Sequence, residues 1–155
     1  MSTNVDLNGI EVLPALRCRQ LLTQGCVGRV GFVAGGRPHV LPVNYAADES
    51  GVVVFRTGAG SLLMAASRQD VAFEVDGLDV AHRSGWSVCV YGTAQEITET
   101  DDPTAAHLRA LGVISWAPGR RERWLAISPL EITGRRLPVH GDLEGVGGWF
   151  PGIPG

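Results

Sequence analysis

One segment of the chain, residues 85–97, alternates between apolar and polar side chains over the longest stretch. Its two faces are made of Trp86, Val88, Val90 and Ala94 on one side, and Ser87, Cys89, Tyr91, Thr93 and Gln95 on the other. Successive side chains of a β-strand point to opposite faces, so this period of two predicts a long strand that is buried on one face. The broad polar face fits a surface turned toward a ligand or a partner.

Five further segments have the composition of strands, namely residues 27–34, 38–46, 52–55, 71–76 and 124–132. Gly35 and Gly36 form a two-residue hairpin signal between the first two of them. Short hairpin connections imply antiparallel pairing. Pro42 and Pro129 have no N–H to donate to a neighbouring strand, so we expect a sheet edge, a bulge or a bend at each. Six short strands in one small domain favour an antiparallel barrel.

Three short helices are expected beside these strands. Residues 14–25 begin with a proline and end at a glycine, and Ser61 precedes an apolar run as a helix N-cap would. Residues 102–112 begin with Asp102 as a cap and Pro103 just inside it. The sequence therefore predicts a mainly β fold with six antiparallel strands and short flanking helices.

The composition limits the classes of partner. A chain of 155 residues fits one domain, and a net charge of −3 with a pI near 5.8 provides no basic surface for nucleic acid. No apolar run approaches the roughly 20 residues of a membrane span, and the N-terminus lacks the regions of a signal peptide. Three scattered cysteines, Cys18, Cys26 and Cys89, suggest neither a disulfide framework nor a zinc site. We therefore expect a cytoplasmic protein that gains stability from a partner subunit.

The chain contains no lysine, because all 13 basic residues are arginine. Schiff-base chemistry on a lysine, including the usual covalent attachment of pyridoxal phosphate, is therefore excluded. Any phosphate must be held by arginine, hydroxyl groups and backbone amides.

A candidate phosphate site follows the buried strand at residues 52–55. Arg56 and Thr57 come next, then the turn Gly58-Ala59-Gly60, then Ser61 at the start of a short helix. The first amides of a helix have no partner within it and carry the positive end of the helix dipole, so they favour an anion. A tight turn that needs only the backbone freedom of glycine explains the same residues equally well. The glycines do not complete a dinucleotide-binding fingerprint.

Other chemistries find little support in the sequence. The four histidines lack the spacing of metal ligands, so we predict no metal site. No serine lies in a G-x-S-x-G elbow. Tyr45 and Trp86, near predicted strand ends, fit either the core, an interface or the wall of a cofactor site. A domain without catalytic groups of its own can still perform redox chemistry when a cofactor supplies it.

Six motifs occur in an order that is familiar: GRVGF (28–32), RPHVLPVNY (37–45), VVFRTGAGS (53–61), VAFEVD (71–76), GWSVCVYGTAQEIT (85–98) and ITGRRL (132–137). This order resembles the pyridoxamine 5′-phosphate oxidase-like superfamily. More narrowly, it resembles an actinobacterial branch of small flavin- or deazaflavin-dependent oxidoreductases. The resemblance implies a split β-barrel at residues 1–137 that forms a homodimer and binds FMN at the subunit interface. Residues 138–155 then form a Gly- and Pro-rich C-terminal arm.

The resemblance also implies three groups of cofactor-binding residues. Those bordering the flavin ring are Pro42, Val43, Asn44 and Tyr45. Those at the phosphate end are Arg56, Thr57, Gly60, Ser61 and Leu62. Those approaching from across the dimer are Trp86, Ser87 and Val88, and Arg135 and Arg136 lie on the strand that closes the fold.

One position departs from the family pattern. A lysine that contacts the phosphate usually follows the Gly-Ser pair, and here that residue is Leu62. A charge-assisted contact contributes about 1.5–3 kcal/mol, so its loss corresponds to about a tenfold or greater loss of affinity. Either Arg56 compensates or the cofactor differs, with a deazaflavin, FAD or another planar ligand as alternatives. The tail does not reproduce the Arg–His pair of the vitamin B6 oxidases, although Arg136 and His140 are present.

The sequence thus predicts a flavin-dependent oxidoreductase that passes hydride or electrons between FMN, or a deazaflavin, and a small organic acceptor. Tyr45 is a candidate proton donor, and the other catalytic residues are not identified by the sequence. The alternative is a non-catalytic protein of the same fold that stores or senses a flavin, haem or related ligand.

Overall fold

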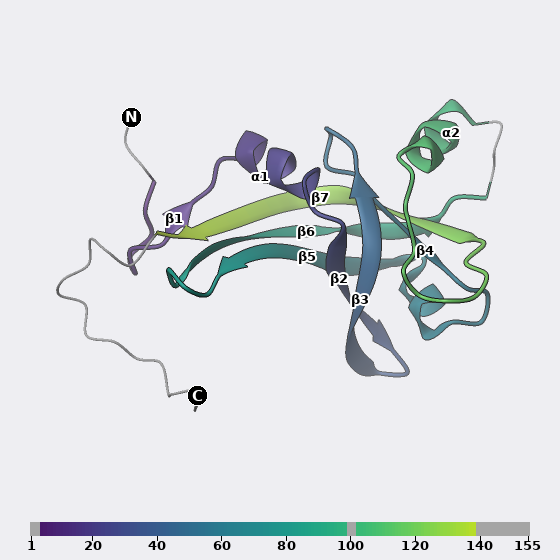
Figure 1. The fold of residues 1–155 in the computed structure, drawn as a ribbon. Helices are drawn as coiled ribbons and strands as arrows, with labels where there is room; N and C mark the ends of the chain where they lie inside the picture. Colours follow the sequence, from purple (N-terminus) through teal and green to yellow (C-terminus); the bar gives the residue numbers. More distant parts are fainter. Residues whose placement is uncertain (1–3, 99–101, 139–155) are drawn as a thin grey trace.

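The computed structural model describes residues 4–98 and 102–138. They form one curved antiparallel sheet (Figure 1), and three short helices lie around it. The strands are β1 (Glu11–Val12), β2 (Val27–Ala34), β3 (Arg37–Ala47), β4 (Val53–Thr57), β5 (Gln69–Asp79), β6 (Ser84–Glu96) and β7 (Arg123–Leu137). Their order is β1-β7-β4-β3-β2-β5-β6, and β7 also pairs with β6, so the six longer strands form a closed ring. The predicted mainly β fold, an antiparallel split barrel of six strands, is confirmed, with the short β1 added at its edge.

The helices are α1 (Ala15–Leu22), η1 (Leu62–Ala66) and α2 (Pro103–Ala110). The start of α2 is as predicted, because the Asp102 carboxylate accepts a hydrogen bond from the Thr104 amide at 3.0 Å. Two expectations need correction: the first helix ends at Leu22 rather than at Gly25, and the helix after Ser61 is a five-residue 3₁₀ segment.

The barrel is split beside β3. This strand pairs with β2 from Arg37 to Asn44, but with β4 only from Tyr45 to Ala47. Pro42 therefore lies where β3 has a neighbour on one side alone, as expected for a residue without an N–H. At the hairpin between β2 and β3, Gly35 and Gly36 both have positive φ, the conformation that such two-residue turns require.

The long β7 bends at the predicted proline. Its register with β6 shifts between Tyr91, which lies opposite Glu131, and Gly92, which lies opposite Pro129. A Cβ at Gly92 would lie 2.0 Å from the Ser128 carbonyl oxygen, so the close approach of the two backbones requires glycine. The bulge lets β7 pair with β6 along most of its length and with β4 near its start.

Two hydrophobic clusters stabilise the fold. The larger fills the barrel, with Phe55, Phe73 and Leu125 among its fully buried side chains. The smaller lies outside the barrel, where Leu108 of α2 and Val113 cover Val54, Ala126 and partly buried neighbours. No helix of the described residues is long and apolar enough to cross a membrane.

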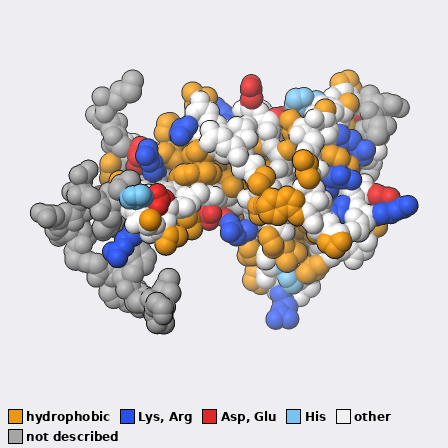
Figure 2. Space-filling view, viewed as in Figure 1, with side chains coloured by type: hydrophobic (Ala, Val, Ile, Leu, Met, Phe, Trp, Pro, Cys, Tyr) orange, Lys and Arg blue, Asp and Glu red, His pale blue; other side chains and the backbone are white. Residues whose placement is uncertain are grey.

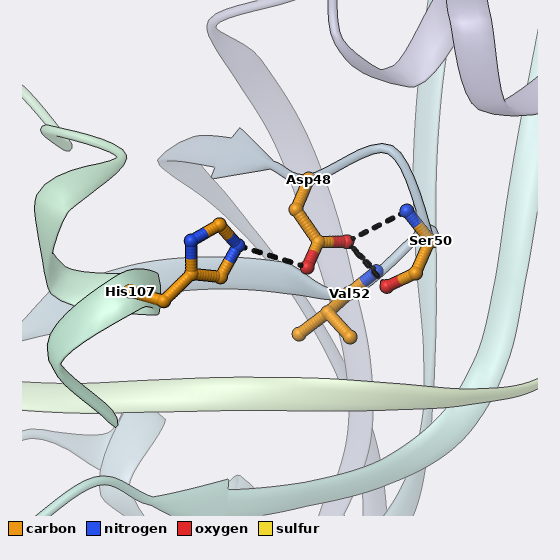
Figure 3. Close-up of polar contacts among 4 residues, drawn as sticks. All are labelled: Asp48, Ser50, Val52 and His107. Carbon is orange, nitrogen blue, oxygen red and sulfur yellow. Dashed lines mark hydrogen bonds and ion pairs between the residues drawn. The ribbon is translucent and has the colours of Figure 1, made fainter. Parts of the chain in front are cut away.

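A single carboxylate joins the turn before β4 to α2 (Figure 3). Asp48 accepts hydrogen bonds from the Ser50 amide (3.0 Å), the Ser50 hydroxyl (2.6 Å) and the Val52 amide (3.1 Å), and its second oxygen lies 3.5 Å from His107 Nε2. Burial raises the pKa of Asp48, but the hydrogen bonds from Ser50 and Val52 and the charge of His107 outweigh it, so the pKa lies below its usual value. The ionised carboxylate thus stabilises both the turn and the position of α2.

Replacing Asp48 by Ala is expected to lower the free energy of unfolding by about 1–3 kcal/mol at neutral pH, because three donors lose their acceptor. A carboxylate whose pKa is lower in the folded protein stabilises above the unfolded-state value and loses that contribution as pH falls through the folded one. In urea unfolding followed by circular dichroism, the difference between wild type and variant should therefore begin to shrink as pH falls below about 4 and continue to shrink at lower pH. The exposed neighbour Glu49→Ala is the control. A difference that does not change with pH would contradict this role.

Candidate functional site

A row of polar and aromatic side chains crosses the outer face of the barrel, from β3 through β4 to β7. Arg56 pairs with Trp124 in the ladder, and its Cζ lies 5.0 Å from the centre of the Trp124 ring. Its Nε donates to the Arg121 carbonyl at 3.0 Å. In the neighbouring strand, the side-chain oxygen of Asn44 accepts from the Trp116 amide at 2.8 Å. The segment between α2 and β7 is therefore attached to both β3 and β4 at this row.

Thr57 does not join Arg56 at a common site. The two residues are adjacent in a strand, so their side chains point to opposite faces. Arg56 is half-buried on the outer face, whereas Thr57 is fully buried and its hydroxyl oxygen has no hydrogen-bond partner in the structure. Within this single chain the two side chains therefore face away from each other, and the contact of both with one phosphate stays a prediction.

The turn after Thr57 also differs from the expected helix N-terminus. Ser61 accepts a hydrogen bond from the Leu63 amide at 3.2 Å, so one of the amides thought free for an anion is already bound. The following helix is a short 3₁₀ segment, so the anion-binding argument from a helix dipole does not hold here. Gly60 has a φ of +75° and is exposed, as the tight-turn interpretation requires. Leu62, 48% exposed, lies at the surface beside it.

The four residues of β3 that were predicted to border the flavin ring also alternate between the two faces of the sheet. Pro42 is exposed and Asn44 is half-buried on the outer face, whereas Val43 and Tyr45 point into the core. The Tyr45 hydroxyl donates to the Leu22 carbonyl at 2.7 Å, which satisfies an acceptor at the end of α1. Burial is the main cause that raises the pKa of Tyr45 far above its usual value. Tyr45 is therefore a core residue in this structure, and its proposed role as proton donor is not supported.

The third predicted group lies at the far end of the sheet, where β5 and β6 extend beyond the barrel. Trp86 and Ser87 are half-buried there, whereas Val88 is fully buried in the core. Trp86 lies opposite Arg136 in the ladder, and both line a cavity of about 360 Å³. The cavity is formed by Gly77, Leu78, Asp79, Ser84, Gly85, Trp86, Arg136 and Leu137. Arg135 points to the other face of β7 and lies opposite Ser87.

The two ends of the predicted site lie far apart within one chain. Gln69, three residues after η1, pairs with Ala94, and Trp86 lies eight residues earlier on the same strand. At about 3.3 Å per residue, this separation is about 26 Å. Figure 1 shows η1 and the β5–β6 hairpin tip at opposite ends of the molecule. The two groups therefore do not form one compact pocket within a single chain.

The sequence analysis missed four residues near Arg56: Arg109, Trp116, Arg121 and Trp124. They lie in α2, in the segment after it and at the start of β7. The run RRER at residues 120–123 could have indicated basic side chains at this site, but such a run more often forms a solvated surface. Within residues 4–98 and 102–138, no three metal-ligating side chains come together.

Replacing Tyr45 by Phe tests the assignment of this residue to the core. The buried Leu22 carbonyl loses its side-chain donor, so we expect the free energy of unfolding to fall by about 1–2 kcal/mol. Thermal and urea unfolding measure this loss. An unchanged stability, together with an altered ligand affinity or turnover, would return Tyr45 to the list of site residues.

This chain resembles several known proteins in sequence and in structure. An uncharacterised protein of Mycobacterium tuberculosis is 34% identical over 116 residues, which cover 71% of this chain and 74% of that protein. The structure of an FAD-binding protein from Mycobacterium smegmatis matches with a TM-score of 0.67 and 30% identity, over 82% of this chain and 98% of the other. An FAD-binding protein from Mesorhizobium loti matches with a TM-score of 0.66 and 25% identity, over 83% and 99%.

A family model extends over most of the barrel. It matches residues 14–136, from the start of α1 to the penultimate residue of β7. This match includes the row at Arg56 and the cavity at Trp86. The chain therefore belongs to the pyridoxamine 5′-phosphate oxidase family.

Proposed function

We propose that this protein is a flavin-dependent oxidoreductase that acts as a homodimer. Its flavin, which is FMN, FAD or a deazaflavin, exchanges hydride or electrons with a small organic acceptor. The observation that carries the proposal is the separation of the candidate site into two ends, each incomplete alone. One end has Arg56 and Asn44, and the other has Trp86 and Arg136 beside a cavity. FAD binding by the structural relatives supports the choice of a flavin.

An apolar stripe on the outer face fits contact with a second copy of the chain. Val40, Gly31, Ala72 and Tyr91 lie side by side across β3, β2, β5 and β6. Val40 is 67% exposed and Tyr91 is 45% exposed. Figure 2 shows hydrophobic side chains gathered over β3. An isologous dimer uses the same patch on both copies. With its twofold axis through this stripe, the Arg56 end of each chain faces the Trp86 end of its partner, which gives two equivalent sites.

The fit to a flavin rests on side-chain donors that the described residues leave unused. Among those residues, Arg56 uses one of its five N–H donors, on a backbone carbonyl. Arg56 would hold the phosphate, Asn44 would border the ring, and Trp86 would pack on the ring from the partner. The bound flavin supplies the redox chemistry. The protein binds and orients it and excludes water.

The second candidate is a non-catalytic protein that binds a flavin, haem or related ligand. The position of Leu62 favours it, because an exposed apolar side chain stands where the resemblance implies a phosphate-binding lysine. Turnover separates the two candidates. A reductase oxidises NAD(P)H or a reduced deazaflavin in the presence of an acceptor, whereas a storage or sensor protein binds its ligand without turnover.

An absorption spectrum of freshly purified protein, followed by titrations with FMN, FAD and the deazaflavin cofactor, tests flavin binding. We expect a flavin band or tight binding of at least one of the three. Arg56→Ala should weaken that binding tenfold or more, because a charge-assisted contact of about 1.5–3 kcal/mol is lost. The exposed Arg37→Ala, at the distant β2–β3 hairpin, is the control. A colourless protein that binds none of the three would overturn the proposal.

A further inference from the structure

Three arginines gather where α2 meets the ends of β4 and β7, and we call Arg56, Arg109 and Arg121 the arginine corner. The Cζ atoms of Arg56 and Arg109 lie 5.0 and 5.6 Å from the centre of the same indole ring, that of Trp124. Arg121 is linked to Arg56 through its backbone, because its carbonyl oxygen accepts a hydrogen bond from Arg56 Nε at 3.0 Å. Figure 2 shows basic side chains gathered over α2 and β4. The two positive charges around this ring repel each other, so an anion placed between them would be stabilised.

The arginine corner has no carboxylate within ion-pair distance among the described residues. Two arginines close to Arg121 in the sequence do have carboxylate partners. Arg120 pairs with Glu122 at 3.4 Å, and Arg123 pairs with Glu96 at 2.7 Å, whereas Arg121 between them pairs with neither. The acidic side chains near this corner are thus used by the two exposed arginines that flank Arg121.

The corner also contains buried polar atoms without partners. The Nε atoms of Arg109 and Arg121 are shielded from solvent and make no hydrogen bond to any of the described residues. A buried polar atom left unpaired costs about 1–3 kcal/mol, so such atoms are normally satisfied. The two unpaired Nε atoms of the corner therefore indicate a polar group that binds there.

A purely structural role explains only part of this arrangement. Arg56 and Arg109 each donate to one backbone carbonyl, that of Arg121 and that of Ile97, and these bonds do hold α2 and the following segment against the barrel. Each guanidinium nevertheless has five N–H donors. The bonds that position α2 leave most donors of the corner unused, including both buried Nε atoms.

We propose that the arginine corner binds a second anionic group of the cofactor, beyond the single phosphate of FMN. The inference rests on the proposed function, because it concerns the cofactor of that site. Two cofactors carry such a group: FAD has a second phosphate, and the deazaflavin cofactor has an acidic tail. Arginine suits either source, since its planar guanidinium binds phosphate and carboxylate through paired hydrogen bonds. The corner would also supply positive charge for an anionic cofactor in a chain that has Leu62 in place of the lysine.

An exposed tryptophan nearby fits the dinucleotide in particular. Trp116 is 70% exposed, and its backbone amide is bound by Asn44 on the same outer face as Arg56. Bases stack on such aromatic surfaces. FAD contains an adenine base that FMN lacks, so Trp116 and the arginine corner together match the part of FAD that FMN does not have.

Flavin binding by purified Arg109→Gln and Arg121→Gln tests the proposal. Dissociation constants for FMN, FAD and the deazaflavin cofactor are measured by fluorescence titration at fixed salt. Each variant should lose at least tenfold in affinity for FAD or for the deazaflavin, with less than threefold change for FMN. Arg120→Gln, adjacent in sequence and already paired with Glu122, is the matched control and should bind all three as wild type does. Circular dichroism and thermal unfolding confirm the fold, and Arg109→Lys is used if Arg109→Gln does not fold.

The results of these titrations identify which cofactor group the arginine corner binds, or reject the proposal. Selective loss of FAD assigns the corner to the second phosphate, and selective loss of the deazaflavin assigns it to the acidic tail. Equal losses for FMN, or no loss for any cofactor, would overturn the inference while leaving flavin binding intact.

If wild type binds no flavin, the proposed function fails and a separate measurement decides on the arginine corner. Inorganic pyrophosphate should then raise the melting temperature of wild type and of Arg120→Gln, but not of Arg121→Gln. A pyrophosphate effect that is absent, or identical in all three proteins, would overturn the inference.

Discussion

The fold depends on the pairing of β7 with two strands at once. Its first residues pair with β4, and it pairs with β6 along nearly its whole length, so this strand closes the ring and links the barrel to the extended β5–β6 hairpin. The double pairing requires a bulge at Pro129 and a glycine at position 92, because the two backbones approach too closely for a Cβ. The same strand carries Trp124 at one end of the molecule and Arg136 at the other, so both ends of the candidate site are placed by one element.

The local pattern of the sequence predicted most of the strands. Alternation along β5 and β6, the paired glycines after β2 and the two prolines each depend on neighbouring residues, and all are found as expected. Asp102 likewise caps its helix as predicted. The helix after Ser61 was less predictable, because a cap and three apolar residues do not distinguish an α-helix from a single 3₁₀ turn.

The candidate site was predicted less well, because strand pairing in the sheet, and not proximity in the sequence, brings its residues together. Arg56 and Thr57 are neighbours in sequence but face opposite sides of β4, and Tyr45 is turned into the core by the same rule. The partners of Arg56 are Trp124 and Arg121, more than sixty residues later. Only the register of β4 with β7 brings them together, and nothing in the local sequence specifies that register.

In the proposed homodimer, one flavin site is built from the Arg56 end of one chain and the Trp86 end of another. Mixed dimers of Arg56→Ala and Trp86→Ala test it, after each variant is shown to fold by circular dichroism. Each homodimer should bind flavin weakly at both sites, whereas the mixed dimer has one intact site and one site damaged at both ends. We predict that tight binding returns at one site per mixed dimer. No recovery on mixing, or tight binding by a monomer, would contradict a site shared between two chains.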